Sequence, residues 1–275
     1  MTELISVIVT TYRREDALEA VLRSLGRQTD GNFEVIVADD GSGPATAALS
    51  HFWQGKIGRR VAHVWQEDRG FRAAEIRNRA VLEARGTYCI FLDGDCLVRP
   101  NFVAAHRGIA ELGWFVTGNR VLLSREETER VLRERDEPER WSLLRWLAAR
   151  LSGRVNRLSA VLQVPLGPLR KLRPRAWQGA RSCNLAIWRS DLLRVDGFDA
   201  DYAGWGKEDS DLIVRLLHAG ARRKDGNFAV GVIHLWHPEA DREKLNENEG
   251  RLADAIQANR VRARRGLSGL AQAPG

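Results

Sequence analysis

The sequence predicts an α/β fold built on a mostly parallel sheet that is flanked by helices on both faces. Short apolar segments rich in β-branched residues alternate with longer segments whose apolar residues recur at helical spacing. The short segments are almost continuously apolar, which is typical of strands buried on both faces of a sheet. Polar residues directly follow three of these segments, at the positions where parallel sheets bind ligands.

The expected elements alternate regularly through the first third of the chain. Strands are expected at residues 5–9, 33–38, 61–65 and 88–92. Helices are expected between them at residues 17–25, 45–53 and 73–84. Because the connecting segments are long enough for crossover helices, neighbouring strands should run parallel. Their polar ends, at residues 10–12, 39–40 and 93–95, should then meet at one edge of the sheet.

Residues 124–176 interrupt this alternation. A charge-rich run at 125–140 predicts a solvated helix, and a basic amphipathic helix should follow it. Its apolar stripe consists of Leu144, Leu147, Leu151, Val155, Leu158 and Leu162, with Arg150, Arg154 and Arg157 on a neighbouring face. Two interpretations remain open: attachment to an anionic membrane surface, and a helical pair that packs over the substrate cleft.

The chain from residue 177 again resembles a globular domain. A helix is expected at 209–219 and a strand at 228–235. The tail after Ala253 is basic and ends in small residues, so we expect a helix that frays. The sequence therefore divides into residues 1–123, 124–176, 177–252 and 253–275.

The composition is that of a soluble globular protein with an excess of positive charge. The 275 residues include 43 Lys and Arg against 36 Asp and Glu, a net charge of +7. Nucleic acid, anionic lipid and phosphorylated small molecules are all compatible partners. No apolar run is long enough to span a membrane, and the first residues lack a secretory signal pattern. We expect a cytoplasmic protein in which Cys89, Cys96 and Cys183 are free thiols.

Two clusters of carboxylates indicate chemistry, because like charges are costly to hold together without a cation or a shared proton. Asp93 and Asp95 flank a glycine after a buried strand, where they could share Mg²⁺ or Mn²⁺ or simply form a turn. Glu208, Asp209 and Asp211 open the expected helix at 209–219. A helix N-terminus favours acidic residues, but a cap needs only one.

Other candidates surround these clusters. His234 and His237 end the expected strand at 228–235, and either imidazole could complete a metal shell begun by Asp95. Trp205 lies between two glycines and could stack on a sugar. Asp40 could bind a nucleoside or form a turn. Arg72, early in the helix at 73–84, is suited to anion binding, whereas Arg77 and Arg79 are expected on a solvated face.

Several motifs, in order, resemble those of a known enzyme family. The segments Ser6–Arg13, Val35–Ser42 and Phe91–Asp95 resemble the family-2 inverting glycosyltransferases, which have the GT-A fold. The segment Gly204–Asp211 resembles the C-terminal motif of galactosyltransferases and chondroitin-synthase-like enzymes. The resemblance covers roughly residues 4–120 and 177–240 and leaves residues 124–175 unmatched.

The resemblance implies a nucleotide-sugar-binding half over residues 1–123 and an acceptor-binding, catalytic half over 177–252. It implies Asp209 as the catalytic base, with Glu208 beside it. The donor-binding residues would be Thr10, Tyr12, Arg13, Asp40, Arg72, Asn78, Asp93 and Gly94. The acceptor would contact Asn184, Trp205, Gly206 and Glu208. A Mn²⁺ or Mg²⁺ ion would be held by Asp93, Asp95, His237 and His234, with Asp95 the more direct ligand and His237 favoured over His234.

The chain departs from the family pattern at two positions. Arg181, Ser182 and Cys183 precede Asn184 where the family often has two glycines, and Lys207 replaces a usual glycine before the acidic pair. Both departures concern the acceptor side. They leave the reaction type implied by the resemblance unchanged.

The implied activity is transfer of a sugar from a nucleoside-diphosphate donor, usually UDP-linked, to a hydroxyl of a glycan or lipid-linked glycan. Synthesis of bacterial cell-surface polysaccharide or lipopolysaccharide would be the setting, with the protein cytoplasmic or peripheral on the inner face of the inner membrane. A nucleotidyltransferase and a non-catalytic sugar- or nucleic-acid-binding module remain alternatives, although we expect no nucleic-acid partner. A dinucleotide oxidoreductase is disfavoured because no glycine-rich loop follows the first strand.

Overall fold

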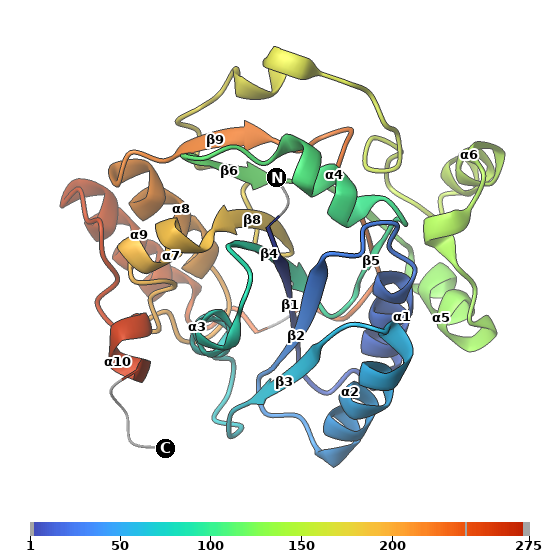
Figure 1. Cartoon of the computed structure of the whole chain (residues 1–275), viewed down its shortest axis with the longest axis horizontal. Coiled ribbons are helices and arrows are strands. Elements are labelled where there is room, and N and C mark those ends of the chain that lie inside the picture. The colour runs from blue at the N-terminus through green and yellow to red at the C-terminus, as the bar shows by residue number, and fades with distance from the viewer. Residues whose placement is uncertain (1–2, 240, 272–275) are drawn as a thin grey trace.

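The computed structural model describes residues 3–239 and 241–271 and is organised around a seven-stranded, mostly parallel sheet (Figure 1). The strand order is β3-β2-β1-β4-β8-β6-β9. The first four strands in the chain, all mutually parallel, are β1 (Ile5–Thr11), β2 (Phe33–Asp39), β3 (Val61–Trp65) and β4 (Tyr88–Asp93). The remaining three are β6 (Trp114–Thr117), β8 (Asn184–Trp188) and β9 (Arg222–Asp225). Only β8 runs antiparallel to its neighbours.

Register places the polar strand ends together, as the sequence predicts. Thr10 on β1 pairs with Asp93 at the end of β4, and Thr11 pairs with Asp39 at the end of β2. β1 and β2 are buried almost throughout, which accounts for their continuously apolar sequences. The three polar segments therefore meet at the carboxyl edge of the parallel half of the sheet.

Helices cover both faces of the sheet (Figure 1). One face packs against α1 (Glu15–Gly26), α2 (Pro44–Ile57) and α4 (Phe102–Ile109). The other packs against α3 (Ala73–Glu83), α7 (Arg189–Arg194), α8 (Glu208–His218) and α10 (Leu267–Ala271). Alternation along β1 separates the two cores, because Val7 and Val9 face the first group of helices and Ile8 faces the second.

A second, three-stranded sheet brings a distant segment to the carboxyl edge. It consists of β5 (Cys96–Val98), β10 (Val232–His234) and β7 (Arg120–Leu122), in that order. His234 pairs with Cys96, and the Leu235 amide donates to the Asp95 carbonyl at 2.9 Å. This pairing places residues 234–237 beside the turn that carries Asp93 and Asp95.

The segment after β7 is less helical than its leucine spacing predicts. It contains α5 (Arg125–Glu134), the 3₁₀ turns η1 (Pro138–Arg140) and η2 (Gly167–Lys171), and α6 (Leu143–Leu151). The expected helix through Leu162 is wrong, because α6 ends at Leu151, before Gly153 at φ 74°. Val155, predicted on the same stripe, is buried and bridges to Leu123. The α6 leucines are exposed, so they do not pack over a cleft.

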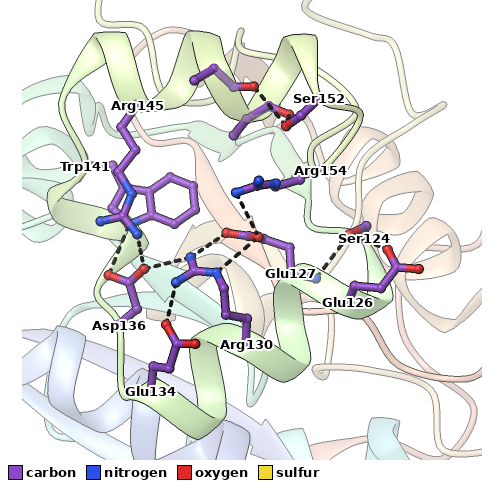
Figure 2. Close-up of polar contacts among 12 residues, drawn as sticks. Ser124, Glu126, Glu127, Arg130, Glu134, Asp136, Trp141, Arg145, Ser152 and Arg154 are labelled. Atoms are coloured by element: carbon purple, nitrogen blue, oxygen red, sulfur yellow. Dashed lines mark hydrogen bonds and ion pairs between the residues drawn. The ribbon is translucent and has the colours of Figure 1, made fainter.

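Ion pairs join α5 to α6, as Figure 2 shows. Arg130 pairs with Glu127, Glu134 and Asp136 at 2.6, 2.9 and 2.8 Å. Asp136 also pairs with Arg145 on α6, and both Arg130 and Arg145 lie over the Trp141 ring. These contacts hold the two helices as one unit, which lies beyond α1 at the edge of the molecule (Figure 1).

The C-terminal segment is more ordered than the frayed helix we expected. The helix α9 (Leu245–Gln257) crosses the predicted boundary at residue 253 and packs on α8. The Ala263 and Leu267 amides then donate to the carbonyls of Val195 and Asp196, each at 3.0 Å. Leu267 is buried against α3 and α7, so apolar contact as well as backbone pairing holds this segment.

Two further expectations concern the whole chain. Among the described residues, no helix is both long and apolar enough to cross a membrane. The three cysteines are free and buried, as expected.

Candidate active site

Three side chains at the carboxyl edge form a group able to bind a metal ion. One ligand atom from each of Asp95, His234 and His237 lies within 4.8 Å of the others. The two Asp95 carboxylate oxygens are each 3.6 Å from an imidazole Nε2, one from His234 and one from His237. This group brings together the first acidic cluster and both histidines predicted from the sequence.

The two histidines are placed so that each directs Nε2 toward Asp95. The Nδ1 of His237 lies 2.6 Å from the Pro238 carbonyl, which can only accept, so Nδ1 carries a proton and Nε2 is the nitrogen that could bind a cation. Burial lowers the pKa of His234, which favours the neutral form of that imidazole. Two imidazoles and a carboxylate at distances too long for direct hydrogen bonds are suited to a divalent ion between them.

The turn that carries Asp95 depends on a close approach of two backbones. The Gly94 amide donates to the Thr10 carbonyl at 2.7 Å. A Cβ at residue 94 would lie 2.9 Å from that carbonyl oxygen and 3.0 Å from the Thr11 side chain. Only glycine fits without movement, so Gly94 positions the two aspartates rather than offering a side chain of its own.

Arg77 links the two acidic clusters, which corrects its expected place on a solvated helix face. Its guanidinium donates to Asp93 at 3.3 Å and to Glu208 at 3.1 Å, and its Nε donates to the Thr10 hydroxyl at 3.1 Å. The Arg77 side chain is only 4% exposed, whereas that of Arg79 is 41% exposed, as predicted. Asp93 pairs with this guanidinium and lies outside the Asp95–His234–His237 group.

The start of α8 presents two carboxylates in different environments. Glu208 is buried, and desolvation together with the Asp209 charge raises its pKa to about 7, although Arg77 opposes the shift. Asp209 is partly exposed; its Oδ1 accepts from the Ser210 amide at 2.7 Å and its Oδ2 from the Ser182 amide at 3.4 Å. Asp209 is therefore the carboxylate that remains accessible to a substrate.

The loop before α8 has backbone angles that explain one departure from the family pattern. Gly204 and Gly206 have φ of 74° and 107°. Lys207 also has a positive φ, 74°, where a glycine would be relaxed, and its ammonium pairs with Glu249 at 3.0 Å. Trp205 is partly exposed, with the Arg242 guanidinium 5.1 Å from its ring centroid.

The first and second strand ends line the same edge. Tyr12 is exposed, and its hydroxyl donates to Asp68 at 3.0 Å; the Arg13 guanidinium also donates to Asp68, at 2.7 Å. Asp40 is buried and accepts from the Arg72 amide at 2.8 Å and the Gln66 side chain at 2.5 Å. The side chain of Arg72 donates to Glu75 at 3.2 Å.

Comparison with known proteins identifies the family. A model described as "Glycosyl transferase family 2" matches residues 6–160, which include β1 to β4 and the Asp93–Asp95 turn. The chain belongs to glycosyl transferase family 2. A second model, described as "N-terminal domain of galactosyltransferase", matches residues 170–237, which include the start of α8 and both histidines.

The curated relatives are longer than this chain. Validoxylamine A glucosyltransferase of Streptomyces hygroscopicus subsp. limoneus is 32% identical over 89% of this chain and 53% of its own length. Hyaluronan synthase of Pasteurella multocida is 28% identical over 86% of this chain and 24% of its own length. The chain therefore spans about half of the first of these relatives and a quarter of the second.

Solved structures share the GT-A fold of this family member. Residues 1–349 of TarS from S. aureus, in complex with UDP, match with a TM-score of 0.61 at 15% identity, over 96% of this chain and 68% of that chain. GalNAc-T7 with UDP, GalNAc and Mn²⁺ matches with a TM-score of 0.63 at 17% identity, over 92% and 48% of the two chains. At these identities the likeness establishes the fold, which agrees with the fold class predicted from the sequence.

Two asparagines predicted to contact substrates lie in the interior of the protein instead. The Asn78 amide nitrogen donates to the Phe198 carbonyl and its oxygen accepts from the Phe198 amide, both at 2.8 Å. Asn184 donates to the Val230 and Asn119 carbonyls at 2.5 and 3.1 Å. Both side chains are fully buried, so neither is accessible to a substrate and both predictions are wrong. They pair backbone groups of adjoining segments.

Three residues near the site were not assigned to it from the sequence: Gln66 and Asp68 were not considered, and Arg77 was expected on a solvated face. Gln66 and Asp68 precede α3 and hold Asp40 and Tyr12, but nothing in the local sequence distinguishes them. Arg77 did have a signal, because residues 73, 77, 80 and 84 recur at helical spacing and the other three are alanines. An arginine on an otherwise small apolar face indicates a buried charge with partners.

The raised pKa of Glu208 predicts a pH-dependent gain in stability for Glu208→Gln. The folded-state pKa of about 7 exceeds the ordinary value of 4.5, so wild-type stability is lost as pH rises from about 4.5 through 7. The glutamine variant should match the wild-type melting temperature near pH 5 and exceed it at pH 8. Thermal unfolding in metal-free buffer checks this, with exposed Glu239→Gln as the control. An equal difference in melting temperature between the variant and the wild type at both pH values would contradict a buried, neutral Glu208.

Proposed function

We propose that this glycosyltransferase is an inverting, metal-dependent hexosyltransferase that uses a nucleoside-diphosphate sugar, with UDP as the nucleotide. The observation that carries the proposal is the Asp93–Arg77–Glu208 contact. Through one guanidinium it joins the strand-end carboxylates, which are suited to a metal, to the helix-start carboxylates, which are suited to proton transfer. A binding module without catalysis would have no use for both clusters.

Asp209 is the proposed general base. An acceptor hydroxyl transfers its proton to a carboxylate oxygen of Asp209 while its oxygen attacks the anomeric carbon of the donor. The bond from that carbon to the diphosphate oxygen breaks as the new glycosidic bond forms on the opposite face, so the configuration inverts. The Ser182 and Ser210 amides hold the Asp209 carboxylate in place for this transfer.

Asp95, His234 and His237 are the proposed ligands of a Mn²⁺ or Mg²⁺ ion. When bound, such an ion neutralises the negative charge that develops on the leaving diphosphate. Arg77 holds Asp93 at the same edge. The UDP and Mn²⁺ in the complex of GalNAc-T7, and the GDP-mannose and Mn²⁺ in that of a Pyrobaculum calidifontis mannosyltransferase, support a donor of this class and a divalent ion.

The remaining donor contacts come from the first two strand ends. Asp40, Tyr12 and Thr10 would hold the nucleoside, with Arg13 and Arg72 near the phosphates. Trp205 and Gly206 would line the acceptor side, where an exposed aromatic ring suits sugar stacking. The acceptor we propose is a hydroxyl of a glycan or lipid-linked glycan in bacterial surface-polysaccharide or lipopolysaccharide synthesis, at the cytoplasmic face of the inner membrane.

Metal-dependent donor hydrolysis tests the proposal. The purified chain should release nucleoside diphosphate from one member of a panel of UDP-, GDP- and TDP-sugars in the presence of Mn²⁺ or Mg²⁺. EDTA should reduce the rate by about 100-fold or more, and added Mn²⁺ should restore it. Release of pyrophosphate from a nucleoside triphosphate and a sugar phosphate would indicate a nucleotidyltransferase instead. Indifference to chelation would remove the ion from the mechanism.

A further inference from the structure

We propose that the outer face of α6 docks on an anionic membrane surface. Docking is independent of the transferase reaction, but its role, the presentation of a lipid-linked acceptor, rests on the proposed function. The α6 docking face is defined here by Leu143, Leu144, Leu147 and Leu151 with Arg150 on the same helix, together with Arg157, six residues beyond the end of the helix.

The leucines of the docking face are exposed and belong to neither of the two hydrophobic cores found in the described part of the chain. Leu144 and Leu151 are 79% and 89% exposed, and Leu143 and Leu147 are also exposed. Residues 143, 147 and 151 are four apart, so they share one side of the helix. The opposite side, with Trp146 and Ala149, is buried. Four of the nine residues of α6 are exposed leucines, and they form an apolar ridge of the kind that marks an interaction site.

The positive charge of the segment that contains this ridge favours an anionic partner. From Trp141 to Ala176 the sequence contains no Asp or Glu. The same segment carries the basic residues Arg145, Arg150, Arg154, Arg157, Arg170, Lys171, Arg173 and Arg175. Arg150 and Arg157 are exposed and take part in none of the ion pairs found among the described residues. Apolar side chains flanked by guanidinium groups match the acyl boundary and the phosphates of an anionic bilayer.

A second copy of the chain fits this face less well. Two basic faces placed against one another would bring like charges together, which opposes association. A bilayer, in contrast, accepts the leucines and neutralises the arginines at the same time. The exposed face is short, nine residues, which is suited to a peripheral contact that adds to acceptor binding rather than to permanent anchoring.

The docking face is connected to the metal-binding group by α5. The Trp236 amide, next to His237, donates to the Thr128 hydroxyl on α5 at 2.8 Å, and the Arg125 guanidinium lies 5.2 Å from the Trp236 ring centroid. At the other end of α5, the Arg130–Asp136–Arg145 pairs lead directly to α6 (Figure 2). Docking of α6 on a membrane would therefore fix the orientation of the active-site edge relative to the membrane surface.

Vesicle flotation of the full chain tests the docking face. Vesicles of phosphatidylglycerol and phosphatidylethanolamine should carry the protein upward at 0.1 M NaCl, and vesicles of phosphatidylcholine should not. Leu144→Gln/Leu151→Gln should lower the bound fraction at least tenfold. The matched control is Leu112→Gln, which removes a leucine that is 75% exposed elsewhere on the surface and should leave binding unchanged.

The basic residues are tested separately. Arg150→Gln/Arg157→Gln should weaken binding by about 25-fold, because each cation near an anionic surface contributes about fivefold. Exposed Lys56→Gln on α2 is the charge control and should have no effect. Binding of the wild type should fall when NaCl is raised to 0.5 M. Thermal unfolding of each variant verifies that the fold is retained.

Three outcomes would overturn the proposal. The first is failure of the wild type to float with anionic vesicles, and the second is a leucine variant that floats as well as the wild type. The third is a dimer in light scattering that the leucine variant loses while vesicle binding is absent, which would identify a second copy as the occupant. Donor hydrolysis in solution should be unchanged in the leucine variant. Flotation without hydrolysis in the wild type would instead count against the proposed function alone.

Discussion

Asp209→Asn is expected to lower the turnover of sugar transfer by about 10³-fold while donor affinity changes less than twofold. Asparagine keeps the size of the side chain, and its single oxygen can still accept from the Ser210 amide, while the longer bond from the Ser182 amide to the second carboxylate oxygen is lost. It cannot accept the acceptor proton, and a positioned general base contributes about 10²–10⁴-fold. Because the proposed donor site is at the strand ends, donor binding should not depend on this change. Initial rates and calorimetric titration of the donor measure the two quantities.

The matched control for this variant is Asp201→Asn. Asp201 pairs with Arg265 at 3.3 Å, and no hydrogen bond or ion pair found among the described residues joins it to Glu208, Asp209 or the Asp95–His234–His237 group. It should retain the wild-type rate. A wild-type rate for Asp209→Asn would remove it from the role of base and leave Glu208, whose raised pKa makes it the alternative proton carrier.

Arg77→Met is expected to lose both activity and stability. The change removes the guanidinium that pairs with both Asp93 and the buried Glu208. Removing one partner of a buried ion pair lowers the free energy of unfolding by about 3–5 kcal/mol. Protonation of Glu208 offsets part of this cost, so the loss should be larger at pH 8 than at pH 5.5. Turnover should fall by at least about 100-fold, because Asp93 and Thr10 are no longer held. Denaturant unfolding at both pH values, with initial rates, measures these effects.

The neighbouring Arg79→Met is the matched control, since it removes the same side chain from the same helix at an exposed position. It should cost less than about 0.5 kcal/mol and leave turnover intact. Arg77→Lys should recover part of the stability but less of the activity, because one ammonium cannot reproduce the geometry of a guanidinium that reaches three acceptors. Equal effects of the 77 and 79 variants would contradict the linking role of Arg77.

The predicted fold and the predicted site differ in how well the sequence supports them. Continuous β-branched segments such as Val35–Val37 predict strands buried on both faces, because β-branched residues favour strands and the apolar run is too short for a typical helix. The same reasoning failed at α6, where leucine spacing continues past the helix end while Gly153 turns the backbone. Periodicity reports which residues are apolar, and backbone angles decide where a helix ends.

At the site, too, the structure agrees with the sequence patterns at some residues and differs from them at others. Asp95 and His237 were predicted because a strand-end carboxylate and an imidazole can share a divalent cation, and because the family resemblance implies a metal site there. Asn78 and Asn184 carry equally polar side chains in equally suggestive motifs, yet each is enclosed and hydrogen-bonded to backbone. A motif does not distinguish an amide that contacts a substrate from one that joins two loops, because both require the same residue type.

The sequence alone predicted the alternation of strands and helices and the meeting of three polar strand ends. It also showed two acidic clusters more than 100 residues apart. These features depend on local composition and on the rules of parallel sheets. Only the tertiary structure decided that Arg77 joins the clusters, that β10 brings His234 and His237 to Asp95, and that the α6 leucines face outward. Each of these depends on contacts between segments distant in the chain, and such contacts are set by the packing of the whole fold.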